Sequence, residues 1–125
     1  MTEYKRGDVI LVNFVFSDET GVRRRPAVII SSDIYHHGRQ EAIVAAVTSQ
    51  TERVLTGDRL IKDWQGAGLL SPSVATGIIR TIKQGMIARK LGAMPQNDMQ
   101  AIDSKLSAAL ALSTATSMPS SPERE

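Results

Sequence analysis

The chain has 125 residues and a formal net charge of +2, with 42% hydrophobic residues, 4% aromatic residues and no cysteine. This length predicts one domain, and the missing cysteines exclude disulfides, thiolate catalysis and zinc–sulfur sites. With so few aromatic residues, the chain cannot form the platform of exposed rings on which single-strand binders stack bases. No apolar run approaches ~18 residues and no signal-peptide pattern is present, which predicts a soluble, cytoplasmic protein.

Residues 7–14 form the first predicted strand. Apolar side chains occur on both of its faces, which indicates a strand that is covered on both sides or lies in a small closed sheet. Residues 17–21 follow as a polar loop that ends in a glycine. Two interpretations of Asp18 and Glu19 in this loop stay open: they are solvated loop acids, or they belong to a flap beside a functional site.

Two short aliphatic runs rich in β-branched residues, 27–30 and 43–48, predict two buried strands. Before the first run, Pro26 holds Arg25 in an extended conformation, and the second run ends at Thr48. If the two strands pair as antiparallel neighbours, the start of the first lies near the end of the second. Arg25 and Thr48 then face one spot, and a guanidinium beside a hydroxyl suits an anionic oxygen, above all phosphate.

Polar residues flank both of these positions. Arg23 and Arg24 precede Arg25, and this cluster is either a solvated basic turn or a set of contacts to neighbouring phosphates. Ser49 and Gln50 follow the second strand and can add hydrogen bonds to phosphate or to base edges. Residues 51–90 hold seven basic and three acidic side chains, which is compatible with a nucleic-acid partner but does not require one.

Residues 34–40, between these two strands, read as a loop with adjacent histidines. Neighbouring side chains of an extended loop point apart, and no third ligand stands at a suitable spacing, so we predict no metal site. Imidazole titrates near neutrality, so His36 is a candidate acid or base, although a surface loop histidine is the commoner outcome.

The second half of the chain predicts further strands at 59–61, 74–83 and 86–91, with Gly77 at a bulge. Trp64 is expected to pack on the sheet or on a partner subunit. Apolar residues at three- and four-residue spacing predict a last helix with one apolar stripe, formed by Met99, Ile102, Leu106, Ala109 and Leu110. We therefore expect a mainly β (α+β) domain over 1–112, built on a small, strongly bent antiparallel sheet or barrel, followed by a disordered tail over 113–125.

At several of these segments the chain resembles the MazF/PemK family, the toxins of type II toxin–antitoxin pairs. The likeness covers roughly Lys5 to Leu112 and rests on the order and spacing of several short pieces: Arg6 to Phe14, Gly21 to Pro26, Ser32 and Asp33, Val47 to Ser49, Gly68 and Leu69, Ser73, Ile79 to Ile82, and Leu91 and Gly92. The resemblance implies an SH3-like barrel of the PemK/CcdB type that works as a homodimer.

The resemblance also implies a metal-independent, sequence-selective endoribonuclease that needs no cofactor and cuts single-stranded RNA, chiefly mRNA. In that reaction the ribose 2′-hydroxyl attacks the adjacent phosphorus and leaves a 2′,3′-cyclic phosphate. Arg25 and Thr48 occupy catalytic positions, and RNA contacts are expected from Arg23, Arg24, Ser32, Ser49, Gln50 and Arg80. Several relatives carry an acid where this chain has Gly77, so two alternatives stay open: Asp18, Glu19 or His36 serves as acid and base, or the activity is low. His36 stands where the family usually has asparagine, which argues against an inherited role.

The implied partners are an antitoxin protein that blocks the RNA groove and operator DNA, which is bound only together with the antitoxin. Two other functions stay open. One is a non-catalytic, protein-binding toxin module similar to the gyrase inhibitor of this architecture, and the missing acid at Gly77 favours it. The other is a DNA-binding autoregulator, for which no recognition helix is visible.

Overall fold

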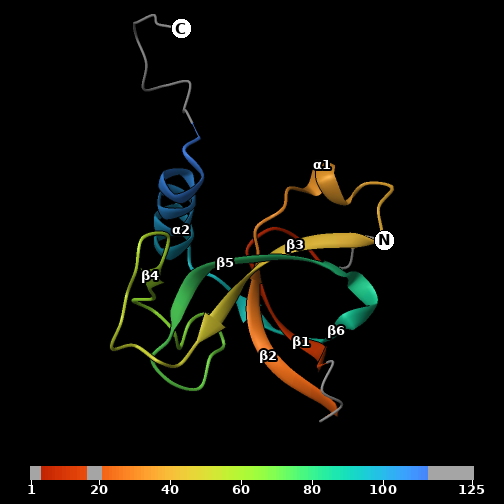
Figure 1. Cartoon of the computed structure of the whole chain (residues 1–125), viewed down its shortest axis with the longest axis horizontal. Helices are drawn as coiled ribbons and strands as arrows, with labels where there is room; N and C mark the ends of the chain where they lie inside the picture. The colour runs from red at the N-terminus through yellow and green to blue at the C-terminus, as the bar shows by residue number, and fades with distance from the viewer. Residues whose placement is uncertain (1–3, 17–20, 113–125) are drawn as a thin grey trace, which may run out of the picture.

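The computed structural model of the chain describes residues 4–16 and 21–112 (Figure 1). Asp18, Glu19 and the tail predicted over 113–125 lie outside the described residues. The elements in chain order are β1 Asp8–Phe16, β2 Gly21–Ile29, α1 Asp33–His36, β3 Glu41–Thr48, β4 Arg59–Leu60, β5 Val74–Lys83, a short 3₁₀ turn Gln84–Met86, β6 Ile87–Ala93 and α2 Gln96–Leu110.

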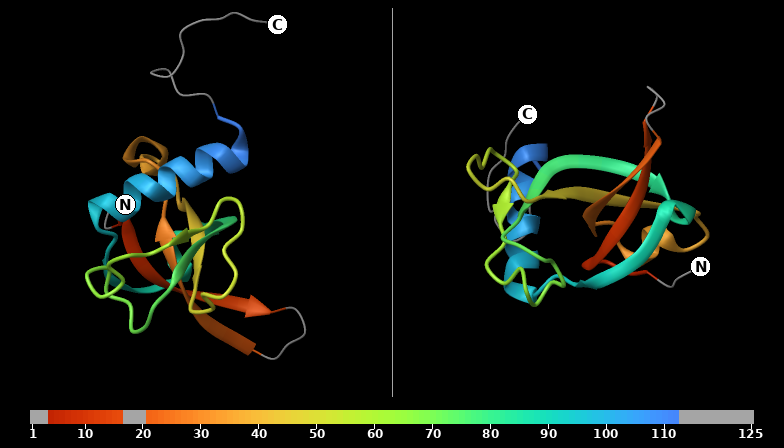
Figure 2. Two further views of the ribbon diagram at one scale, coloured as in Figure 1. Left: turned by 90° about the vertical axis from the view of Figure 1, so that its left-hand side faces the viewer. Right: turned by 90° about the horizontal axis from the view of Figure 1, so that it is seen from below.

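The six strands form one antiparallel sheet in the order β4-β5-β3-β2-β1-β6. The sheet is strongly bent, and α2 lies across one side of it (Figure 2). Three residues of β5, Thr76 to Ile78, lie opposite the single residue Ala46 of β3, because Ala45 pairs with Ile79 and Val47 with Ala75. Gly77 is therefore part of a bulge, as predicted, and such extra residues help a strand to bend.

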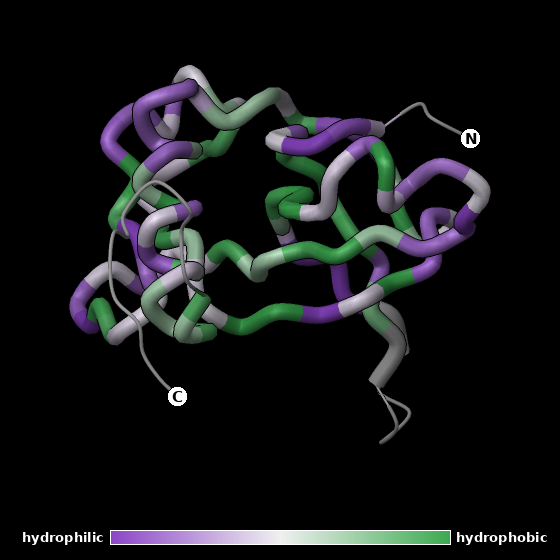
Figure 3. The backbone as a smooth tube through the Cα atoms, turned by 90° about the horizontal axis from the view of Figure 1, so that it is seen from above, coloured by the Kyte–Doolittle hydropathy of each residue, from purple (hydrophilic) through white to green (hydrophobic). Residues whose placement is uncertain are grey.

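The core occupies both faces of the sheet, as the pattern of the first strand predicts. Val9 of β1 packs in a cluster with Ile102 and Leu106 of α2. Ile10 and Val12 point to the other face and pack in a second cluster. Full burial of one such aliphatic side chain contributes about 1.5–3 kcal/mol, so both clusters stabilise the bend. Hydrophobic positions follow the central strands, and the connections at the periphery are mostly hydrophilic (Figure 3).

Helix α2 is the predicted C-terminal helix. Ile102 and Leu106 are buried, and Met99 packs against the same cluster. The predicted stripe is wrong at its end, where Leu110 is 52% exposed, because the helix ends there and Ala111 turns the chain with a left-handed φ of 58°. Trp64 packs against the core cluster that contains Ile102 and Leu106 of the helix. Of its two expected positions, the sheet or a partner subunit, this agrees with the sheet. Among the described residues, no helix combines the length and the apolar character that crossing a bilayer requires.

A buried ion pair fixes α2 to the connection after β4. The Asp98 side chain is 2% exposed and accepts hydrogen bonds from the Arg59 guanidinium at 2.7 and 3.1 Å and from the backbone N–H of Lys62 at 2.9 Å and Asp63 at 3.1 Å. Burial by itself raises the pKa of Asp98, but these donors outweigh it and hold the pKa below its ordinary value. The carboxylate thus remains charged inside the fold.

Two local interpretations are wrong. Of the two left open for the arginine cluster, the basic turn is excluded, because β2 begins at Gly21 and pairs with β1 from Gly21 to Val28, with Arg25 opposite Val12. The segment after Ser32 is not an extended loop, because α1 forms there. The Ser32 hydroxyl accepts a hydrogen bond from the Tyr35 N–H at 3.1 Å, which is the usual way in which serine starts a helix.

Candidate active site

The polar ends of two neighbouring strands meet at one end of the bent sheet. Strands β2 and β3 pair antiparallel, with Ala27 opposite Ala46 and Ile29 opposite Val44. If the same register continues by two residues, Arg25 lies opposite Thr48. Because side chains alternate along a strand, Arg25 and Thr48 continue the face that carries Ala27, Ile29 and Val44 of the second core cluster. The apolar inner face therefore ends in a guanidinium and a hydroxyl.

Arg25 and Thr48 line one open groove of about 890 Å³. Ser49, Gln50 and Arg80 line it too, so the structure gathers five of the site residues predicted from the sequence. The remaining lining comes from β1, β2, β3, β5, β6 and the loop before β5, namely Leu11, Phe14, Pro26, Ala46, Val47, Gly68, Leu69, Leu70, Ser71, Ser73, Ile78, Arg89 and Leu91. A groove of this size with hydroxyls and cations on its walls is suited to an extended anionic ligand.

Thr48 is held in a local turn. Its Oγ1 accepts a hydrogen bond from the Gln50 N–H at 3.1 Å, an arrangement in which a hydroxyl replaces a backbone acceptor at a strand end. Since the oxygen accepts this bond, the hydroxyl hydrogen is free to point elsewhere. Thr48 can thus donate a hydrogen bond to a ligand oxygen in the groove.

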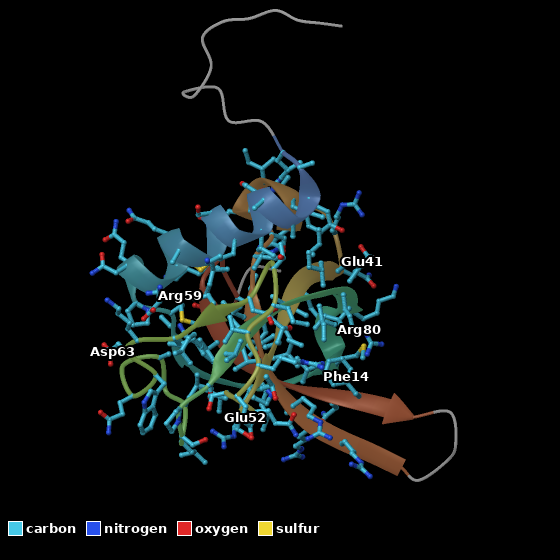
Figure 4. The ribbon with its side chains drawn as sticks, turned by 60° about the vertical axis from the view of Figure 1, so that its left-hand side comes forward. Phe14, Glu41, Glu52, Arg59, Asp63 and Arg80 are labelled. Carbon is cyan, nitrogen blue, oxygen red and sulfur yellow. The ribbon has the colours of Figure 1, made fainter. Side chains whose placement is uncertain are left out.

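The cations of the groove differ in how they are held. Arg25 is exposed and makes no hydrogen bond or ion pair with any described residue. Arg80 lies over the Phe14 ring, with its guanidinium carbon 4.7 Å from the ring centre, and the two side chains are adjacent in Figure 4. This contact fixes the guanidinium without neutralising it.

Arg89 of β6 is a groove residue that the sequence analysis missed. It pairs with Leu11 of β1, and Leu11 pairs on its other side with Pro26, the residue after Arg25. The alternating pattern of β6 predicts which side chains share a face with Arg89, but not which part of the protein that face contacts. Arg89 reaches the groove because β6 pairs with β1, and a local sequence pattern does not reveal this pairing.

Three predicted RNA contacts lie outside the groove lining. Arg23 and Arg24 are exposed on β2, and the Arg24 Nε donates to the Asn13 side-chain oxygen at 3.0 Å. The positive charge of β2 therefore continues beyond the groove from Arg25 to Arg24 and Arg23. Ser32 is committed to the start of α1, at the opposite end of β2.

The family of PemK-like, MazF-like toxins of type II toxin–antitoxin systems matches residues 5–110 of the chain. The chain belongs to this toxin family. It is 32% identical over 112 residues to the endoribonuclease EndoA of Bacillus subtilis (strain 168), and the match covers 86% of this chain and 95% of EndoA.

Solved structures of similar proteins agree in fold. The MazE–MazF complex of Deinococcus radiodurans aligns with a TM-score of 0.74 at 20% identity, covering 88% of this chain and 97% of that chain. A mycobacterial endoribonuclease in complex with its cognate antitoxin aligns with a TM-score of 0.71 at 20% identity, covering 89% and 98%. The predicted mainly β fold, a bent antiparallel sheet with a C-terminal helix, is thereby confirmed.

His36 does not fit the expectation of a surface loop histidine. Its side chain is buried, and its Nε2 lies 2.5 Å from the Ser31 Oγ. It is absent from the lining of the groove, because α1 turns it inward beneath the start of β3. Among the described residues, this toxin has no group of three histidine, aspartate or glutamate side chains that could hold a metal ion.

A second, smaller cavity of about 430 Å³ adjoins the groove, and we call it the side cavity. Both cavities are lined by Ala46, Thr48, Gln50 and Ile78. The side cavity is completed by the loop after β3 and by the bulge of β5, through Glu52, Arg53, Leu55, Thr56, Asp58, Thr76 and Gly77.

At the bulge, the Asp58 Oδ1 accepts a hydrogen bond from the Gly77 N–H at 2.8 Å. The Gly77 position, at which the resemblance implies an acid in other family members, is thus approached by a carboxylate from another segment. The sequence analysis missed Asp58, because it stands 19 residues before Gly77.

Proposed function

We propose that this toxin is a metal-independent endoribonuclease that cuts single-stranded RNA at the groove. The observation that carries the proposal is the convergence of Arg25 and Thr48 on one open groove at the end of β2 and β3. The endoribonuclease names of the relatives support the same reaction class. We expect the protein to act on RNA in the cytoplasm.

In the proposed reaction, the ribose 2′-oxygen forms a bond to the adjacent phosphorus. The bond from phosphorus to the 5′-oxygen breaks, leaving a 2′,3′-cyclic phosphate and a 5′-hydroxyl. The 2′-hydroxyl loses a proton and the 5′-oxygen gains one. The intermediate phosphorane carries extra negative charge on its non-bridging oxygens, and donors aimed at these oxygens lower the barrier.

Arg25 and Thr48 are the proposed donors. The Arg25 guanidinium offers a fork of N–H donors, and the Thr48 hydroxyl hydrogen is available because its oxygen already accepts from the Gln50 N–H. Ser49, Gln50, Arg80 and Arg89 are proposed to bind RNA along the groove, and Arg23 and Arg24 to contact phosphates beyond it. Asp18 and Glu19 remain the proposed acid and base, since His36 is buried outside the groove.

The proposed partners follow from the relatives. Two of the similar structures are complexes with an antitoxin, so we expect a cognate antitoxin to bind this toxin as well. A homodimer, and operator DNA bound only with the antitoxin, complete the proposed assembly. Size-exclusion chromatography with light scattering tests the dimer.

A second candidate function is a toxin that acts by binding a protein. It is favoured by the groove lining, which contains no carboxylate or histidine among the described residues. Such a toxin would use the groove as a docking surface and would need no acid or base.

Incubation of the purified toxin with a long RNA in EDTA separates the two functions. The endoribonuclease yields discrete fragments that end in a 2′,3′-cyclic phosphate. Such an end resists both phosphatase and 3′-end ligation until acid opens the ring, after which phosphatase removes the phosphate and ligation succeeds. Intact RNA, together with growth inhibition by the expressed toxin, would favour the protein-binding function. Arg25→Ala is the control, because a contaminating nuclease would cut in both samples.

A further inference from the structure

The side cavity lies where the base of a bound nucleotide can enter it. Thr48, the proposed phosphate contact, lines both the groove and the side cavity. A nucleotide is small compared with the combined space, and its base lies a few bonds from its phosphate. An RNA whose phosphate lies at Thr48 can therefore extend a base past Gln50 into the side cavity.

Two polar side chains that line the side cavity, Asp58 and Thr76, already form hydrogen bonds within the protein. The Asp58 carboxylate accepts hydrogen bonds from Gly77 and from Leu55, each at 2.8 Å. The Thr76 hydroxyl donates to the Ala46 carbonyl at 2.7 Å and accepts from the Ile78 N–H at 3.1 Å. These bonds hold the loop after β3 against the β5 bulge and leave little capacity for a ligand.

Glu52 and Arg53, by contrast, line the side cavity without internal hydrogen bonds among the described residues. Both side chains are exposed and line the side cavity, and Glu52 is labelled in Figure 4. Within the described part of the chain, neither forms a hydrogen bond or an ion pair, even with the other. A carboxylate and a guanidinium are thus both available on one wall.

Among the four RNA bases, guanine complements this pair best. Its Watson–Crick edge has two neighbouring donors, N1–H and the N2 amino group, which match the two oxygens of a carboxylate. Its other edge has two neighbouring acceptors, O6 and N7, which match the fork of an arginine. Adenine and cytosine each offer a single amino donor group, and uracil offers a single N–H.

We propose that the side cavity binds a guanine base of the RNA, with Glu52 accepting from N1–H and N2 and Arg53 donating to O6 and N7. This assignment rests on the proposed endoribonuclease function and adds its base preference. Glu52 and Arg53 are then specificity residues, and the chemistry remains with Arg25 and Thr48.

The test uses the full chain and short RNAs. Mapping of fragment ends on a long RNA first identifies the position at which guanine is preferred. Binding is then measured by fluorescence anisotropy on oligonucleotides with a 2′-O-methyl group at the cleaved nucleotide, which cannot be cut. Guanine at the mapped position is replaced by inosine, which lacks the N2 amino group, or by 7-deazaguanine, which lacks N7.

For the unsubstituted toxin, inosine is expected to weaken binding roughly 10-fold. Glu52→Gln should reduce this penalty without changing the 7-deazaguanine penalty, and Arg53→Gln should do the reverse. Glu41→Gln and Arg39→Gln are matched controls, because these side chains pair outside both cavities. They should keep both penalties.

Each other outcome overturns the assignment in a distinct way. Cleavage without guanine preference, or equal penalties in all variants, refutes the guanine site and leaves the endoribonuclease intact. A uniform loss of cleavage in Glu52→Gln would make Glu52 a proton-transfer group instead. Absence of both cleavage and RNA binding by the unsubstituted toxin refutes the proposed function and the guanine site together.

Discussion

The side of the sheet beneath α2 and the groove at the end of β2 and β3 both contain arginine, in different electrostatic positions. The Arg59 side chain is 20% exposed and donates two hydrogen bonds to the buried Asp98 carboxylate. Arg25 is exposed and has no such bond among the described residues. The first guanidinium is neutralised by the fold, and the second keeps its charge and its donors for a ligand.

This contrast separates stability from function. A buried charge that loses its partner is costly, so Arg59 and Asp98 are needed for the attachment of α2. An exposed arginine without partners contributes little to folding, and we propose that Arg25, in the groove that Thr48 also lines, serves ligand binding. Mutations of the two arginine sites should therefore affect different measurements.

The largest expected effect on folding comes from Asp98→Ala. This change leaves the Arg59 guanidinium and the N–H groups of Lys62 and Asp63 without their acceptor. The free energy of unfolding should fall by about 3–5 kcal/mol, measured by urea denaturation. RNA cleavage by the remaining folded protein should be nearly unchanged at low temperature. A loss below about 1 kcal/mol would show that the ion pair does not fix the helix.

Arg25→Ala should produce the reverse pattern. Removal of a principal donor to the phosphorane costs about 100- to 1,000-fold in cleavage rate, whereas the free energy of unfolding should change by less than about 0.5 kcal/mol. Single-turnover cleavage of a labelled RNA and a urea curve give both numbers. Arg39→Ala, an exposed arginine that lies over Tyr35, is the control and should cleave normally. Near-full cleavage by Arg25→Ala would falsify the assignment.

The sequence predicts the elements that have a strong local pattern. Strand β5 and helix α2 follow from alternation and from three- and four-residue spacing, and the meeting of Arg25 with Thr48 follows from one assumed antiparallel pair. Helix α1 was missed because its four residues are too few to show a period. Arg89 and the contact between Arg59 and Asp98 were missed because they depend on partners distant in sequence.

Acid should weaken the attachment of α2, because protonation removes the charge of Asp98. The pKa of Asp98 is lowered in the folded state, so its stabilising effect is complete above the unfolded pKa of about 3.9 and is lost as the pH falls toward the folded pKa. The difference in unfolding free energy between the unsubstituted toxin and Asp98→Asn should therefore shrink between about pH 5 and pH 3. A difference that stays constant over this range would contradict the charged, hydrogen-bonded state of Asp98.

The smallest effect is expected from Arg24→Ala. Arg24 lies on β2 beyond the groove lining, where it is proposed to contact a phosphate without taking part in the chemistry. Binding of an uncleavable RNA should weaken modestly, and the slope of log affinity against log salt should fall by about 0.7, the value for one phosphate of a single strand. An unchanged slope would remove Arg24 from the RNA path, and a large loss of cleavage rate would move it into the active site.

The most direct test of the account is a crystal structure of the toxin with an RNA that carries 2′-deoxyribose at the cleaved nucleotide. The account predicts that a non-bridging oxygen of the scissile phosphate accepts hydrogen bonds from both the Arg25 guanidinium and the Thr48 hydroxyl. A scissile phosphate bound elsewhere, with these two side chains in contact only with water, would contradict the central claim.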